Sequence, residues 1–110
     1  MNGDLATGLA RALCAKIVNF MNFGGIVEVE LLAYSEWASV TFAGARHSVQ
    51  IALEGPGSVG AAADFLDALP ELDFTICGHI VADVALVAEE RGGDGDYAVL
   101  ELEALTIEHR

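Results

Sequence analysis

Basic side chains are scarce in this 110-residue chain. Five lysines and arginines stand against seventeen aspartates and glutamates, which gives a formal net charge of −12. A nucleic-acid-binding protein needs a basic patch that displaces the counterions of the phosphates. We therefore expect neither nucleic acid nor a membrane surface as a partner, and the acidity is typical of a charge that keeps an apolar protein soluble. The five bases are scattered along the chain: Arg11, Lys16, Arg46, Arg91 and Arg110.

Long uninterrupted apolar segments are also lacking. A membrane-spanning helix needs about 20 mostly apolar residues, and the segment 17–27 is broken by two asparagines and two glycines. The N-terminus does not have the order of a secretory signal, because Asp4 precedes the first base. The sequence therefore predicts a cytoplasmic protein.

Cysteine is rare, and it forms no metal-binding pattern. Cys14 and Cys77 are far apart, and without an export signal two buried free thiols are favoured over a disulfide, which the sequence alone leaves open. Cys77 and His79 are two residues apart, but zinc needs three or four ligands. The glycine-rich segment 92–96 is typical of a hairpin turn and lacks the rest of a calcium loop. We expect no metal and no cofactor.

Apolar residues are abundant, at 54% of the chain, and the mean hydropathy is +0.46. A domain of this length can bury about two-thirds of its unfolded surface without metals or disulfides. The excess of apolar residues predicts further burial against a partner, and the commonest closed assembly is a homodimer. We expect a single domain over 1–110 that forms a homodimer.

The sequence contains an internal similarity. Residues 24–33 and 78–88 align at an offset of 54, so that Gly24, Ile26 and Val27 correspond to Gly78, Ile80 and Val81, and the alignment continues after one inserted residue. Each segment follows an apolar stretch with helical spacing. This pattern predicts two copies of a helix–strand–strand unit, over about 1–55 and 56–110.

The first half is expected to begin with a helix. Apolar residues recur at steps of three or four from Leu5 to Met21, with Asp4 as N-cap and the glycines at 24–25 as the end. Alternation over 26–34 predicts a strand with one wet face, followed by a turn at 35–36. The alternation changes phase at 44–47, which indicates either a bulge in one long strand or a hairpin turn.

The second half is expected to repeat this order. Ser58 is the predicted N-cap of a helix that runs to Leu69 and is ended by Pro70. A long strand is predicted over 75–90, a hairpin loop over 91–96 and a last strand over 97–108. In the long strand, even-numbered residues from Ile80 to Ala88 are expected to share one face.

These elements predict an α+β fold. Two helix–strand–strand units can join edge to edge into one antiparallel sheet with both helices on one face. The order resembles a ferredoxin-like plait whose starting strand has moved to the end. The other sheet face is left for a partner sheet or a ligand.

Five residues are candidate ligand-binding positions. Arg46 and His47 are two of the few positive or potentially positive groups, and they can receive an anionic ligand at the phase change. Tyr34 and Trp37 lie near the first predicted turn, where aromatic side chains either anchor a partner or cap the core. His79 is the remaining candidate.

Acidic residues on the wet strand faces form a further group. Carboxylates that meet in a cleft can act as an acid–base pair, whereas carboxylates on neighbouring strands more often form a solvated sheet face, which we favour. They are Glu28, Glu30, Asp83, Glu101 and Glu103.

The sequence carries no catalytic signature, so a non-catalytic homodimeric module that binds a small molecule or a protein is the favoured function. The alternative is a small dimeric enzyme of the plait type. Its apolar pocket would use His47 or His79 as general base, with Tyr34, Trp37 or Tyr97 as a further polar group. A third role, as a subunit that stabilises a larger assembly, has the same sequence features as the first.

Overall fold

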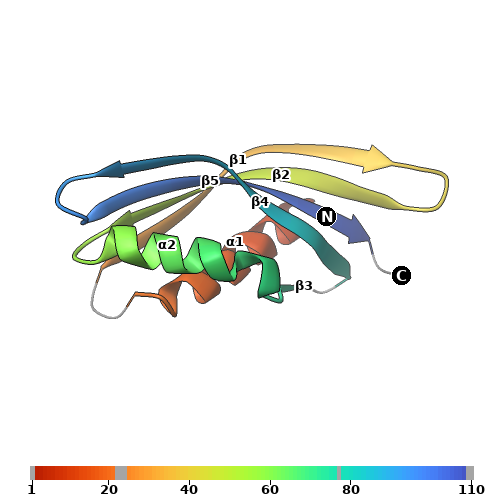
Figure 1. Ribbon diagram of the computed structural model, residues 1–110. Helices are drawn as coiled ribbons and strands as arrows, with labels where there is room; N and C mark the ends of the chain where they lie inside the picture. Colours follow the sequence, from red (N-terminus) through yellow and green to blue (C-terminus); the bar gives the residue numbers. More distant parts are fainter. Residues whose placement is uncertain (1, 22–24, 77, 109–110) are drawn as a thin grey trace.

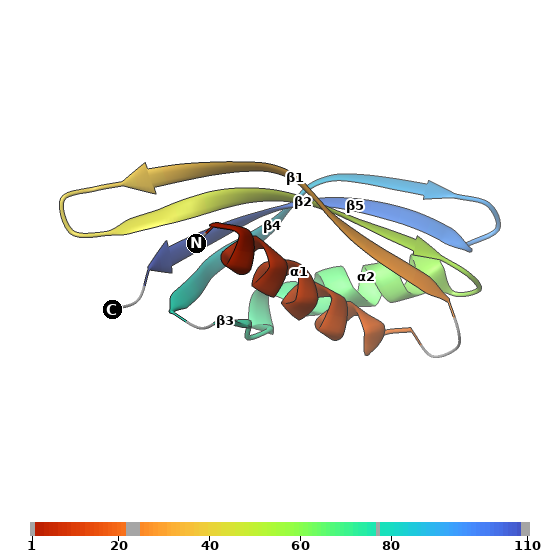
Figure 2. The ribbon, with the colours of Figure 1, turned by 180° about the vertical axis from the view of Figure 1, so that it is seen from behind.

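The computed structural model describes residues 2–21, 25–76 and 78–108 (Figure 1). Two helices lie against one face of a sheet, as both views show (Figures 1 and 2). The elements in chain order are α1 (Asn2–Val18), β1 (Ile26–Ala38), β2 (Ala43–Glu54), α2 (Ser58–Ala68), the 3-10 helix η1 (Leu69–Glu71), β3 (Thr75–Ile76), β4 (His79–Gly92) and β5 (Tyr97–Glu108).

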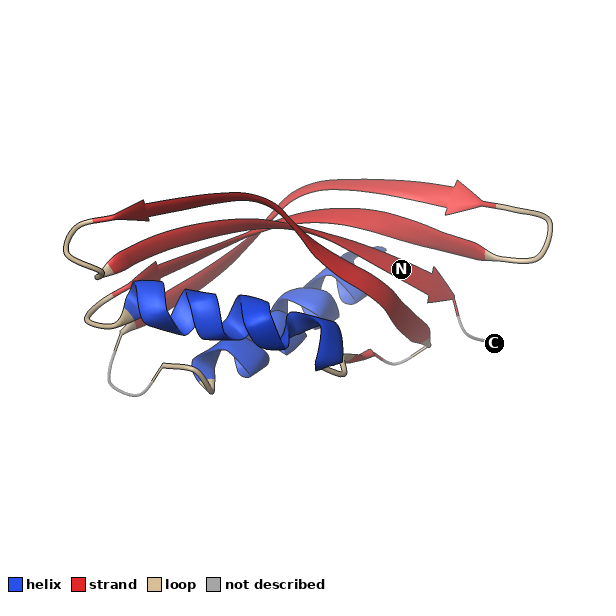
Figure 3. Ribbon diagram, in the orientation of Figure 1, coloured by secondary structure: helices blue, strands red, loops and turns tan. Residues whose placement is uncertain are grey.

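The sheet has the order β1-β2-β5-β4-β3, and every neighbouring pair is antiparallel. Four strands are long, and β3 contributes only two residues at the end of the sheet. Figure 3 separates the sheet from the helical layer beneath it. The expected α+β class, with two helices on an antiparallel sheet, is confirmed.

The hydrophobic core fills the space between the helices and the sheet. We call the helix-covered face of the sheet the inner face and the opposite face the outer face. Along β2 and β5, alternate residues are buried on the inner face, as expected for strands with one covered side. The buried residues of the core are Leu9, Leu13, Ile17, Val49, Ile51, Leu53, Ala62, Phe65, Leu69, Ala98, Leu100, Leu102 and Ala104.

Both helices are present, with boundaries that differ from the expected ones. Helix α1 begins at Asn2, so Asp4 lies inside it and is not its N-cap, and it ends at Val18, well before the glycines at 24–25. Helix α2 begins at Ser58, and its N-cap is Gly57 in the left-handed conformation. The Ser58 hydroxyl instead donates a 2.7 Å hydrogen bond to the carbonyl of Gly55.

The first hairpin turns later than the sequence pattern indicated. Strand β1 continues through the predicted turn at 35–36 to Ala38, and the turn is made by 39–42. The Ser39 N–H donates to the carbonyl of Phe42 over 2.7 Å, and the Phe42 N–H donates to the Ser39 hydroxyl over 3.1 Å. Residues 44–47 form neither a bulge nor a turn, because β2 pairs without interruption through them.

The predicted strand over 75–90 is also wrong in part. A tight turn divides it, with Gly78 at φ +80°, and Thr75 pairs back with Ile80. Two register shifts, between Val81 and Asp83 and between Leu86 and Ala88, then interrupt the alternation of β4. Each shift moves later residues to the other face, so Val84 and Leu86 share the inner face with Val81 rather than with Ile80.

The two hairpins extend beyond the helical layer at opposite ends, which makes the molecule elongated, with extents of 49 × 23 × 20 Å (Figures 1 and 2). We call β1 with β2 the first hairpin and β4 with β5 the second hairpin. Within the described residues, neither helix has the length and the apolarity needed to span a membrane.

Candidate functional site

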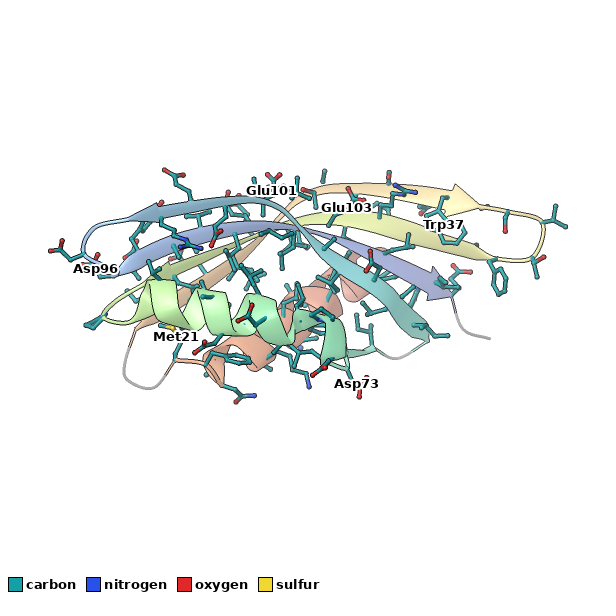
Figure 4. All side chains as sticks on the ribbon, viewed as in Figure 1. Met21, Trp37, Asp73, Asp96, Glu101 and Glu103 are labelled. Atoms are coloured by element: carbon teal, nitrogen blue, oxygen red, sulfur yellow. The ribbon has the colours of Figure 1, made fainter. Side chains whose placement is uncertain are left out.

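A cleft of about 320 Å³ lies on the inner face, where the first hairpin extends past the start of α1. We call it the first-hairpin cleft. Figure 4 shows Trp37, one of its lining residues, near the tip of this hairpin. The lining residues with functional groups are Tyr34, Glu36, Trp37, His79 and Glu108, with Leu5 of α1 as an apolar wall. By the strand register, Tyr34 and Glu36 direct their side chains to the inner face, whereas Trp37, which pairs with Gly44, is at an alternate position of β1.

Strand pairing brings these residues together from distant parts of the chain. Tyr34 pairs with His47 and Glu36 pairs with Ala45, and both partners are buried on the inner face of β2. His79 is the first residue of β4 and pairs with Glu108 near the end of β5. Since β5 lies beside β2 in the sheet, the start of the second hairpin meets the tip of the first.

Tyr34 is surrounded by negative charge. Its hydroxyl donates a 3.2 Å hydrogen bond to Oε1 of Glu36. Burial raises the pKa of Tyr34, and the hydrogen bond to Glu36 and the negative charges of Glu36 and Glu108 raise it further. The phenol therefore stays protonated at neutral pH, and the carboxylates of Glu36 and Glu108 both lie close enough to influence the Tyr34 hydroxyl.

His47 lies beside Tyr34 in the interior, with 1% of its surface exposed. The two rings form an edge-to-face pair, with centroids 5.2 Å apart and planes at 64°. Burial lowers the pKa of His47, and the neighbouring His79 lowers it further. His47 is therefore neutral at pH 7, as a buried imidazole without a carboxylate partner should be.

The hydrogen bonds of His47 restrict the donor and acceptor roles of its two ring nitrogens. Nε2 of His47 is 3.1 Å from the Thr106 hydroxyl, and this hydroxyl donates to the carbonyl of Ala45 over 3.4 Å. When the hydroxyl proton is used in that bond, His47 donates from Nε2 and its Nδ1 is an acceptor; when the hydroxyl donates to Nε2, the roles of the two nitrogens are reversed. Nδ1 is buried and has no hydrogen-bond partner among the described residues.

Trp37 packs closely against Gly44, with which it pairs across the hairpin. A Cβ at Gly44 would come within 2.8 Å of the indole ring and would collide with the carbonyl oxygen of Thr106. Glycine is therefore required for the ring to lie against the strand. The indole Nε1 is buried without a hydrogen-bond partner in the described part of the chain.

The structure gathers four of the five candidate ligand-binding residues. Tyr34, Trp37 and His79 line the cleft, and His47 lies directly behind Tyr34. Arg46 is separate. It is exposed and lies 3.7 Å from Glu103, whereas its neighbour His47 is buried on the inner face. The two adjacent residues therefore do not converge on one anion, because successive side chains of a strand point to opposite faces.

Two further residues took part in alternatives drawn from the sequence. Tyr97 begins β5 and pairs with Glu54 and Gly92, at the other end of the strand from the cleft. Cys77, which was weighed with His79 as a metal-binding pair and set aside, lies outside the described residues. Cys14 is a half-buried free thiol of α1.

The strand carboxylates lie on the outer face, consistent with a solvated sheet surface. Glu101 pairs with Gln50, and Glu30 pairs with the same residue from the other side. Figure 4 labels Glu101 and Glu103 on the side away from the helices. In the described ranges no three His, Cys, Asp or Glu side chains converge as potential metal ligands.

Sequence reasoning missed Glu108 and Thr106 as parts of the site. Both belong to the predicted last strand, and their spacing there carries no functional signal. Only the β2–β5 register, in which Ala45 pairs with Thr106, brings them to the first hairpin. Such non-local pairing cannot be obtained from local periodicity.

The cleft is rich in hydrogen-bond acceptors and aromatic surface. Its ionisable side chains are two carboxylates, one phenol and one imidazole, and its described lining contains neither lysine nor arginine. These groups can orient a polar ligand, in particular one that carries hydrogen-bond donors. No protein-family model matches the sequence, and no curated protein is significantly similar to it.

Proposed function

We propose that the protein is a non-catalytic homodimeric binding module, built from two αββ units arranged as a permuted ferredoxin-like plait. A second copy pairs with the free edge of β1, and a ligand occupies the first-hairpin cleft. The observation that carries the proposal is the concentration of exposed apolar side chains on β1, an edge strand, and on β4, which β3 covers only at its start.

The corresponding irregularities of the two hairpins support the duplication. The register shift between Leu31 and Ala33 in the first hairpin corresponds, 55 residues later, to the shift between Leu86 and Ala88. The other register shift in β4, between Val81 and Asp83, falls where the sequence alignment has its one inserted residue. In addition, the β2–β5 register is symmetric about the pair Val49–Leu102 when β2 and β5 are related by an offset of 53.

Edge strands expose unpaired backbone groups, and natural monomers usually protect them with charge or keep them short. Strand β1 has 13 residues and a β-strand neighbour on one side only in the described sheet. Most of the exposed large apolar residues lie on two strands: Ile26, Leu31, Leu32 and Tyr34 on β1, and Ile80, Leu86 and Val87 on β4.

Strand β1 is the better interface of the two. The start of β4 is already covered by β3, and its end carries Glu89, Glu90 and Arg91, which resist strand addition. In the described sheet, no strand pairs with the other edge of β1. Pairing of two β1 strands about a twofold axis would bury the same residues from both copies, as closed homodimers require.

A matched pair of variants tests this interface. Leu32 and Val87 occupy corresponding positions at the two register shifts and are 43% and 57% exposed. We expect the wild type and Val87→Asp to be dimers in native mass spectrometry and sedimentation velocity, and Leu32→Asp to be a monomer with unchanged circular dichroism. A monomeric wild type, or dissociation by Val87→Asp alone, would refute the β1 interface.

The geometry of His47 supports the enzyme as a second candidate. A neutral imidazole nitrogen next to a cleft is suited to general-base chemistry. However, the 1% exposure of His47 keeps the nitrogen from a ligand unless Tyr34 moves. Incubation of wild type and His47→Gln with pools of metabolites, followed by mass spectrometry, tests it: turnover that depends on His47 supports an enzyme.

A further inference from the structure

We propose that a second copy of the chain completes the first-hairpin cleft, with Val29 of the partner subunit as part of the wall beside β1. The inference rests on the proposed homodimer and specifies what its interface builds. It is argued from the exposed side chains at the border of the cleft, the register of β1 and the positions of the carboxylates on this strand.

The cleft lies at the border of the sheet. Its lining runs from α1, the start of β4 and the end of β5 across β2 to Tyr34 and Glu36 on β1. Beyond β1 the described sheet has no further strand. Leu31 and Tyr34 are 38% and 37% exposed, although both pair with buried residues of the inner face. The helices of the same chain therefore leave this border of the cleft uncovered.

The second hairpin protects the corresponding border with charge. Glu89 and Arg91 occupy the inner-face positions that correspond to Tyr34 and Glu36, and their side chains lie 3.0 Å apart. Charged side chains on an exposed strand resist the addition of another strand. The first hairpin has an aromatic ring where the second has Glu89, so its border is the one suited to burial by a partner.

The symmetry of a β1–β1 pair determines which sheet faces meet. Two copies of one edge strand that pair antiparallel are related by a twofold axis perpendicular to the sheet. Opposite residues of an antiparallel pair point to the same face. Inner side chains of one copy therefore lie opposite inner side chains of the other, and both helical layers lie on the same side of one continuous sheet.

The register shift of β1 then restricts the pairing. Before the shift between Leu31 and Ala33 the inner positions have odd numbers, and after it they have even numbers. Two registers keep inner residues opposite inner residues along the strand. In one of them Tyr34 lies opposite the partner's Val29, and in the other Glu36 does. Both registers place the partner's Val29 at the border of the cleft.

The carboxylates of β1 favour the same two registers. In both, Glu28, Glu30 and Glu36 lie opposite uncharged residues. The register between them would place Glu28 opposite the partner's Glu36, and like charges directly opposite each other destabilise a strand pair. Charge and the facing of the side chains therefore select the same pairings.

This dimer has two equivalent clefts, and each is bordered by apolar side chains of the other copy. Val29 is half-buried against the core of its own subunit, so it forms a fixed wall. A ligand in the cleft would touch both subunits, and its binding would be coupled to dimerisation.

Disulfide trapping between mixed single-cysteine variants tests the pairing, in a background whose two native cysteines are replaced by serine. Val29→Cys is mixed with Tyr34→Cys or with Glu36→Cys, one for each register, and mildly oxidised. We expect one of these mixtures to give a cross-linked heterodimer in mass spectrometry. Glu30→Cys mixed with the same two variants is the control and should not cross-link, because its side chain points to the outer face and Cβ vectors that point apart cannot be bridged.

Isotope-filtered NMR gives a second measurement, which needs no substitution. A wild-type dimer mixed from isotope-labelled and unlabelled chains should show nuclear Overhauser effects between the Tyr34 ring and methyl groups of the other chain. We expect these methyl groups to belong to Val29 or Leu31 of the partner subunit.

The outcomes separate this inference from the proposed function. Cross-linking of Glu30→Cys as efficient as that of Val29→Cys would overturn the composite cleft. A dimer without contacts between subunits at Tyr34 would also overturn it, while the homodimer of the proposed function stands. If the wild type sediments as a monomer, both fail.

Discussion

At the scale of single residues, His47 is the side chain whose position packing alone does not explain. It occupies the inner-face site that Leu100 fills in the second hairpin. A leucine at this site packs in the core without polar atoms. A histidine there has to be neutral, and its Nδ1 has no hydrogen-bond partner among the described residues. A buried polar atom without a partner costs about 1–3 kcal/mol. Such a cost is typical of a residue retained for function.

The lowered pKa of His47 predicts a stability that falls in mild acid. In the unfolded chain the imidazole takes up a proton near pH 6.5, whereas in the folded protein it does so only at lower pH. Below about pH 6.5 the unfolded state therefore binds more protons. The free energy of unfolding then decreases as pH falls, by at most about 1.4 kcal/mol per pH unit for this one group.

Urea denaturation of wild type and His47→Leu between pH 7.5 and pH 5.5 measures this contribution. The variant should lose the part of the pH slope that belongs to His47. At pH 5.5 it should be the more stable of the two. Identical slopes would contradict a buried neutral His47.

Two glycines predict opposite effects of the same substitution. Gly44→Ala would force a methyl group against the Thr106 carbonyl and the Trp37 ring, and we expect a loss of about 2–4 kcal/mol from overpacking and strand distortion. Gly60 lies in α2 with nothing within 4 Å of an added Cβ. Gly60→Ala should stabilise the protein by about 0.5–1 kcal/mol. Thermal denaturation compares the two, and equal effects would contradict the close contact at Gly44.

At the scale of elements, the sequence predicts strands with regular alternation, but it does not predict turns and register shifts that depend on strand pairing. The last strand is found with its observed bounds because 97–108 alternates without interruption. The first turn was wrongly placed at 35–36 because Glu36 breaks the apolar pattern. In the structure this carboxylate pairs in register with Ala45, and the cross-strand bonds of Ser39 make the turn. A polar residue at a sheet end is compatible with a strand.

The phase change at 44–47 has a similar origin. The change of phase arises only if the even-numbered Val40 and Phe42 are taken as part of the strand, whereas they belong to the exposed turn and are 106% and 56% exposed. Once they are assigned to the loop, β2 has a single phase. In β4 the sequence pattern instead concealed two irregularities. The segment 80–88 is apolar except for Asp83, so its residues fit either sheet face, and the two register shifts leave no visible break in the alternation.

The candidate site was partly predictable for the same reason. Tyr34 and Trp37 are close in sequence, and aromatic residues near a strand end are a local signal. The contribution of His79 depends on the second hairpin reaching the tip of the first, which is a property of the β2–β5 register. The expected convergence of Arg46 with His47 failed because adjacent strand residues face opposite sides.

Helix α2 predicts the largest single loss of stability. Phe65 is fully buried between α2 and the sheet and makes an edge-to-face contact with Phe20, with ring centroids 5.9 Å apart. Phe65→Ala is expected to cost about 3–5 kcal/mol through lost burial and a cavity. Phe42→Ala, at the exposed turn, is the control and should change stability by less than about 0.5 kcal/mol. Urea midpoints measure both, and similar losses would contradict the assigned core.

At the scale of the whole molecule, the negative charge of the outer sheet face limits how two copies can associate. The outer face carries carboxylates on β1, β5 and β4, among them Glu30 and Glu101, which both pair with Gln50 of β2. A second sheet stacked on this face would bring like charges together, which disfavours stacking. The proposed association through the edge of β1 would keep the two outer faces side by side and exposed to water.

The net charge of −12 predicts that salt strengthens folding and also the proposed dimer. Like charges within a protomer and between protomers repel, and raising NaCl from about 0.05 to 0.5 M shortens the screening length to a few ångströms. We expect Tm to rise by about 4 °C, which corresponds to about 1 kcal/mol for a domain of this size, and the dimer dissociation constant to fall.

A double variant identifies where the repulsion arises. Glu30→Gln combined with Glu101→Gln removes two carboxylates of the outer face without touching the cleft, so its Tm should already be higher at low salt and should respond less to NaCl. Scanning calorimetry and sedimentation equilibrium at both salt concentrations give the two quantities. If salt lowered Tm or dissociated the dimer, attractive ion pairs rather than apolar edges would have to hold the assembly together, and the β1 interface with its uncharged Leu31 and Leu32 would be the wrong one.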